Sequence, residues 1–140
     1  MVASTAQLEH GFGEVKRLCY AGLDAPTLLR AVAARVGRVA PFEAYCAQTN
    51  DPVSGLLTQV LTTEAFGEQA HRTYLEQIYF QEDRDEQWKM VWNRIPVVWL
   101  SDVTGGDVDR ALRCRELTGP MGLGYEALAI CAVGQRQWAG

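Results

Sequence analysis

Apolar residues recur at helical spacing in the first part of the chain and predict two helices. The first is expected over residues 4–21, with an apolar stripe formed by Leu8, Phe12, Val15, Leu18 and Cys19. The second begins after Asp24, because a carboxylate there suits the N-cap position and Pro26 is tolerated in a first turn. Gly37 and Pro41 are expected to close this second helix.

A β-hairpin follows the helices. We expect a first strand over residues 42–48 and a second over residues 56–63. The second has alternating side chains and a high β-branched content, which suit the edge of a sheet with one wetter face. The residues between the strands favour turns, and they include Asn50, Asp51, Pro52, Ser54 and Gly55.

Helical spacing returns in the middle of the chain. Ala70, Tyr74 and Ile78 recur every four residues and predict a helix over residues 67–80. An acidic connector then leads to a short aromatic helix, whose apolar face carries Trp88, Val91, Trp92 and Ile95. Pro96 disfavours helical backbone in the residue before it, so residues 97–100 are predicted to form a strand.

The stretch from residue 104 to residue 133 predicts a capped helix, a glycine turn and a strand. Thr104 and Asp107 fit a capping box, so a helix is expected to begin there and to end at Gly119 and Pro120. The apolar run over residues 127–133 is typical of an interior strand.

The end of the chain predicts an incomplete hairpin. Residues 134–137 look like a turn, and the second strand would begin at Trp138 and then be cut off. The preceding strand would then expose unpaired backbone groups, which favours a homodimer. The apolar stripe of the first helix offers an alternative dimer surface.

Composition limits the classes of protein to consider. The chain has 140 residues, of which 48% are hydrophobic, so one globular domain with a substantial core is expected. A formal net charge of -4 and the absence of a Lys/Arg cluster argue against direct contact with nucleic acid. The sequence has neither a secretory signal nor a membrane-spanning stretch, and we expect a cytoplasmic protein without membrane contact.

Three stretches together resemble a known family. They are LCYAGLDAPTL at residues 18–28, PFEAYCAQTND at residues 41–51 and ELTGPMGLGYEALAICAVGQRQWAG at residues 116–140. In this order they resemble the N-terminal GAF-like sensory domain of LuxR-family transcription regulators. The resemblance implies an α+β fold, GAF-like, with a central antiparallel sheet and helices packed on its faces. The predicted elements alone fit a GAF or a PAS-like sensor equally well.

One departure from the family concerns the end of the chain. In the family a further strand, a terminal helix and a DNA-binding helix-turn-helix domain follow the Trp-Gly pair. Here the sequence ends at Trp138-Ala139-Gly140, so we expect residues 1–140 to be a single sensory domain that lacks those parts.

The resemblance also implies where a ligand would bind, since GAF domains hold small molecules between the sheet and the helices over one face. Here those helices are expected within residues 67–94. Aromatic side chains combine apolar area with a hydrogen-bonding edge, and Arg94 offers a planar fork for a carboxylate or phosphate. The candidate ligand-binding residues are Tyr45, Tyr74, Tyr79, Trp88, Trp92, Arg94 and Trp99. The alternative is that the aromatic residues fill an ordinary core and that Arg94 caps a helix.

Other chemistry has little support in the sequence. His10 and His71 have no metal-ligating residue at a recognised spacing, so neither a metal nor another cofactor is expected. The cysteines form no CxxC pair, and Cys46 has no base or second thiol beside it. The glycines match neither a phosphate-binding loop nor a dinucleotide fingerprint. No catalytic residue is therefore assigned.

We therefore expect a non-catalytic domain that senses an unidentified small molecule and forms a homodimer, as part of a LuxR-type regulator. Two alternatives remain open: a protein-interaction module with a filled core, and a small redox or hydrolytic enzyme centred on Cys46. A ligand or cavity beside Trp99 would favour the sensor, a solid core the interaction module, and a contact between Cys46 and His71 the enzyme.

Overall fold

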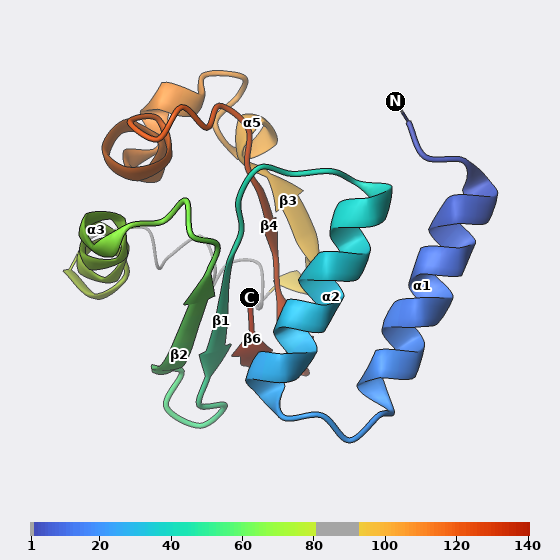
Figure 1. Cartoon of the computed structure of the whole chain (residues 1–140). Helices are drawn as coiled ribbons and strands as arrows, with labels where there is room; N and C mark the ends of the chain where they lie inside the picture. The colour runs from blue at the N-terminus through green and yellow to red at the C-terminus, as the bar shows by residue number, and fades with distance from the viewer. Residues whose placement is uncertain (1, 81–92) are drawn as a thin grey trace.

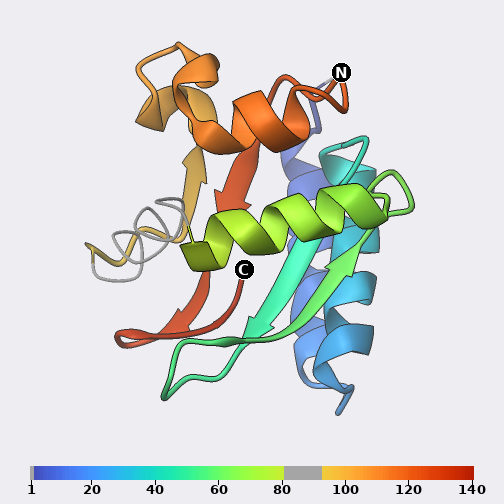
Figure 2. The ribbon, with the colours of Figure 1, turned by 90° about the vertical axis from the view of Figure 1, so that its left-hand side faces the viewer.

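An antiparallel sheet lies between two layers of helices in the computed structural model, which describes residues 2–80 and 93–140. On one side, helix α2 (Ala25–Val39) lies over the sheet and α1 (Thr5–Cys19) packs on the outside of α2 (Figure 1). On the other side, α3 (Glu68–Phe80) crosses the sheet, as Figure 2 shows. The predicted α+β class, with helices on both faces of an antiparallel sheet, is confirmed.

Both predicted N-terminal helices are confirmed, and each begins with a side-chain cap. The backbone N–H of Gln7 donates to Ser4 Oγ, and the Ser4 N–H donates to Gln7 Oε1, which makes a capping box. Asp24 accepts a 2.8 Å hydrogen bond from the Thr27 amide, as expected of an N-cap. Helix α2 continues through Gly37 before it ends at Val39.

Close packing and one carboxylate hold α1 against α2. Gly11 is buried at their contact, where a Cβ atom would lie only 2.9 Å from Val39 Cγ2. The helices therefore approach closely because this position has no side chain. Glu14 Oε1 on α1 lies 3.3 Å from Arg35 Nε on α2.

The predicted hairpin forms β1 (Cys46–Asn50) and β2 (Leu57–Thr62), which pair antiparallel. β2 lies at the edge of the sheet, as its sequence predicts. Asp51 orders the turn between them, since its Oδ1 accepts hydrogen bonds from the amides of Val53 and Ser54. The first strand begins later than residue 42 because Phe42 packs beside Gly37 instead of extending the sheet.

The middle of the chain follows the prediction in part. The helix predicted over residues 67–80 is α3, and the strand predicted over residues 97–100 is β3 (Val97–Trp99). This strand is one residue shorter because Leu100 begins the short helix α5 (Leu100–Val103). The predicted aromatic helix lies mostly outside the described residues.

The prediction that a helix begins at Thr104 is wrong, although helical backbone does end at Gly119 as predicted. Thr104 Oγ1 instead donates back to the carbonyl oxygen of Leu100 at 2.8 Å, so Thr104 ends α5. Gly105 and Gly106 follow at φ values of 65° and 90°, which a helix does not allow. The segment continues as a short 3₁₀ turn, η1 (Val108–Arg110), and a π-helical segment, η2 (Cys114–Thr118).

The strand predicted over residues 127–133 is interrupted at Ile130. β4 (Ala127–Ala129) pairs with β3, and β5 (Cys131–Val133) pairs with β6 (Arg136–Ala139). The larger sheet has the order β2-β1-β6-β5. The prediction of an interior strand is only partly correct, because Ile130 is buried while most other residues of the run are exposed.

The prediction of an incomplete final hairpin is wrong. Gly134 adopts a φ of 61°, and the returning strand β6 begins at Arg136, before Trp138. β6 pairs with β5 on one side and with β1 on the other. Gly140 continues this pairing, since its N–H and carbonyl groups exchange hydrogen bonds with Gln48 at 3.1 and 2.7 Å. β6 therefore occupies the edge of β5 on which the first dimer prediction rested, and β5 is an outer strand of the sheet.

Candidate functional site

Several polar side chains are buried between α3 and the sheet. On β1, the alternation of side chains directs Cys46, Gln48 and Asn50 toward α3. Helix α3 contributes Tyr74 and Gln77, and the segments after β3 contribute an ion pair. We call this set the buried polar cluster; its members are Cys46, Gln48, Asn50, Tyr74, Gln77, Arg113 and Glu126.

A chain of hydrogen bonds runs from α3 into the hairpin. The Tyr74 hydroxyl donates to Gln48 Oε1. Gln48 Nε2 donates to Asn50 Oδ1 at 3.3 Å, and Asn50 Nδ2 donates to the Gly55 carbonyl oxygen at 3.3 Å. Because Gln48 is only 2% exposed, these bonds replace those that water would make.

One ion pair closes the other side of the buried polar cluster. Arg113, immediately before η2, places its Nη1 2.5 Å from Oε1 of Glu126, which immediately precedes β4. Arg113 is buried, so its charge depends on such a partner. Both ionic groups act electrostatically on Cys46 and Tyr74, which places all four side chains together.

Gln77 is the most deeply buried side chain of the cluster. It is 1% exposed, and neither its Nε2 nor its Oε1 has a hydrogen-bond partner among residues 2–80 and 93–140. It shares a helical face with Tyr74 and Ala70, which pack toward the sheet. Glu126 Oε2 is likewise buried without a partner. Leaving a buried polar atom unpaired costs about 1–3 kcal/mol, so two such atoms in one amide are a feature to be explained.

Burial keeps the two weakly acidic groups of the cluster protonated. It raises the pKa of the Cys46 thiol to about 11, although a hydrogen bond with Tyr74 and the nearby Arg113 charge oppose the shift. Burial also raises the pKa of Tyr74 well above its ordinary value. At neutral pH Cys46 and Tyr74 are therefore both uncharged.

The structure divides the predicted aromatic ligand site between two faces of the sheet. Tyr74 lies in the buried polar cluster. Tyr45 lies one residue before Cys46, so its side chain points to the opposite face, where its ring packs edge-on against Phe42 at 6.0 Å. The predicted aromatic set is thus not one site, because strand alternation separates its members.

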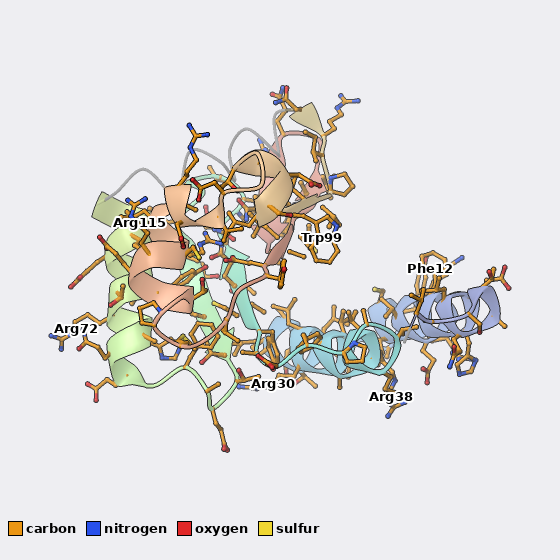
Figure 3. All side chains as sticks on the ribbon, turned by 90° about the horizontal axis from the view of Figure 1, so that it is seen from above. Phe12, Arg30, Arg38, Arg72, Trp99 and Arg115 are labelled. Carbon is orange, nitrogen blue, oxygen red and sulfur yellow. The ribbon has the colours of Figure 1, made fainter. Side chains whose placement is uncertain are left out.

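Two further predicted residues lie away from the buried polar cluster. Trp99 is 54% exposed and lies on the side of the sheet that faces α1 and α2 (Figure 3). Arg94 is exposed and adopts a φ of 57°. The side chain of Tyr79, and all of Trp88 and Trp92, lie outside the described residues.

The sequence analysis missed most of the buried polar cluster, although the positions of some of its polar residues in the sequence pattern could have indicated it. Gln77 falls at the spacing of Ala70 and Tyr74, so it is a polar residue on the buried face of a helix. Gln48 and Asn50 similarly share one face of a strand. No local pattern indicated that Arg113 would meet Glu126, since their pairing depends on how η2 packs beside β4.

Other kinds of site find no support in the described part of the chain. Residues 2–80 and 93–140 contain no group of three His, Cys, Asp or Glu side chains arranged to hold a metal ion. No helix within those residues is long and apolar enough to cross a membrane. No protein-family model, curated protein or solved structure matches the chain.

We predict that Cys46 in the folded protein resists alkylation. Its pKa of about 11, against an ordinary value of 9.0, lowers its thiolate fraction at pH 8 roughly a hundredfold relative to the unfolded chain. Labelling with iodoacetamide, mapped by mass spectrometry with and without urea, measures this ratio. The rate in the folded protein should rise toward pH 11. Rapid labelling of Cys46 at pH 7 would instead indicate an activated thiol.

Proposed function

We propose that this chain is a non-catalytic sensory domain, GAF-like in fold, that binds a small molecule in the buried polar cluster and forms a homodimer. The observation that carries the proposal is Gln77, whose amide is fully buried and has no partner in the part of the chain that the structure describes. The α+β arrangement and the sequence resemblance to sensory domains of LuxR-type regulators agree with it. The work of such a domain is to convert binding into a change of helix arrangement.

The composition of the buried polar cluster favours binding of a small molecule over a purely structural role in the core. An apolar residue in place of Gln77 would fill the same face of α3 without the cost of an unpaired amide. A bound molecule that pairs with this amide would offset that cost, so ligand binding and helix packing would be linked. This favours a sensor over an interaction module with a filled core.

The contacts of Cys46 argue against an enzyme centred on this thiol. His71 Nε2 lies 2.9 Å from Thr62 Oγ1, and the hydrogen bond that acts on Cys46 comes from Tyr74. A thiol with a raised pKa is a poor nucleophile at neutral pH, since the thiolate is the reactive form. We therefore assign Cys46 to the wall of the binding site.

The proposed dimer surface lies on the other side of the sheet. Phe12 on α1 is 71% exposed, and Val97 and Trp99 on β3 are also exposed. Figure 3 places Phe12 and Trp99 on the same side of the molecule, whereas Arg38 extends on the opposite side of the helix pair. In the proposed dimer a second copy buries these exposed apolar side chains.

Native mass spectrometry tests the sensory role. Protein purified from its native host should carry a small molecule that is released on unfolding. Gln77→Met should lose most of that molecule because Met has a similar length and no amide. Gln69→Met, at an exposed position of the same helix, should retain it. Equal occupancy in all three proteins, or none in the wild type, would contradict the assignment.

A second prediction concerns the dimer. Phe12→Glu should shift the protein from dimer to monomer in sedimentation velocity, because a carboxylate would be buried at the contact. Val53→Glu is the matched control, since Val53 is also exposed but lies in the turn after β1. A wild-type protein that stays monomeric at all concentrations, or a dimer that tolerates Phe12→Glu, would exclude this surface.

A further inference from the structure

We infer that the ligand of the buried polar cluster is a neutral molecule with an amide edge, in which an N–H donor and a C=O acceptor lie side by side. This inference rests on the proposed function and adds the chemical class of the ligand. Lactams, carboxamides and nucleobases with an amide edge belong to this class.

The carboxamide of Gln77 fits a ligand with an amide edge. Gln77 presents an N–H donor and a carbonyl acceptor in one plane, and both lack a partner. A ligand with the complementary pair can form two parallel hydrogen bonds, as amide side chains do with base edges. A hydroxyl or an ether would leave at least one of the two atoms poorly paired.

The charges of the buried polar cluster favour a neutral ligand. Arg113 already binds Glu126 at 2.5 Å, so its positive charge has a counter-ion. A ligand carboxylate or phosphate would bring a further negative charge into a buried region, which is costly. Cys46 and Tyr74 are neutral and offer no compensating charge.

The unpaired acceptors of the cluster also favour nitrogen in the ligand. Among the described residues, two buried acceptor atoms of the cluster have no hydrogen-bond partner, namely Gln77 Oε1 and Glu126 Oε2. A ligand N–H group can pair with an acceptor of this kind, whereas a molecule with acceptors alone cannot. Nitrogen-bearing ligands are therefore favoured over esters and ketones of the same shape.

A pair of small probes of nearly equal size tests this class. δ-Valerolactam has the adjacent N–H and C=O groups, and δ-valerolactone lacks only the N–H. Each is titrated into the ¹⁵N-labelled full chain and followed by NMR chemical shifts. The lactam should bind roughly tenfold more tightly than the lactone, since a missing donor leaves a buried acceptor unpaired. The zwitterion 5-aminopentanoate should bind more weakly than the lactam.

Two variants assign the effect to Gln77. Gln77→Met should remove the difference between lactam and lactone, and Gln69→Met should preserve it. Equal binding of the two probes to the wild type, tighter binding of 5-aminopentanoate, or an ordered water on Gln77 that no probe displaces would overturn the inference. If the probes fail while a host-derived molecule still depends on Gln77, only the ligand class is wrong. If no molecule of any class depends on Gln77, the proposed function fails as well.

Discussion

The burial of a partly polar helix face against the sheet is the constraint on which the rest of this structure depends. Helix α3 packs through Tyr74, which contacts Leu117 of η2 and donates its hydroxyl hydrogen bond to Gln48 of β1. Once this face is buried, each polar group on it needs a partner. Arg113 therefore requires Glu126, and Cys46 remains protonated. Gln77 departs furthest from this rule, because both polar atoms of its amide are buried without a partner among the described residues.

The sheet separates two surfaces of different character. The α3 side is buried and carries the polar groups, whereas the side facing α1 and α2 leaves Trp99 and Phe12 exposed. Strand β1 belongs to both, since Gln48 faces α3 while Thr49 faces the other way. In our proposal ligand binding on the α3 side and dimer formation on the other side meet at this sheet.

Local sequence signals predicted the elements whose causes are local. The caps at Asp24 and the turn at Asp51 act within a few residues, so the helices and the hairpin could be predicted. The role of Thr104 could not be predicted from its neighbours. A threonine can cap the start of a helix or hydrogen-bond back to the last turn of one, and here it does the latter. The place of β6 between β5 and β1 depends on pairing with residues far away in sequence.

Of the residues predicted to bind a ligand, only Tyr74 belongs to the buried polar cluster. A search for aromatic residues groups them by type, whereas the sheet assigns them to faces, and Tyr45 and Trp99 lie on the face away from Tyr74. The polar residues that matter most were visible only as exceptions to an apolar pattern. Gln77, which shares the buried face of α3 with Tyr74, is the clearest of these exceptions. The sequence alone does not show that its side chain is buried.

The free energy of unfolding of Gln77→Met, compared with the wild type in ligand-free protein, tests this account most directly. If the buried amide of Gln77 is unpaired until a ligand binds, its replacement by an apolar side chain of similar length should raise the free energy of unfolding by about 1–3 kcal/mol. The exposed control Gln69→Met should change it little. A loss of stability in Gln77→Met would show that the amide is already paired within the fold, and would contradict the account.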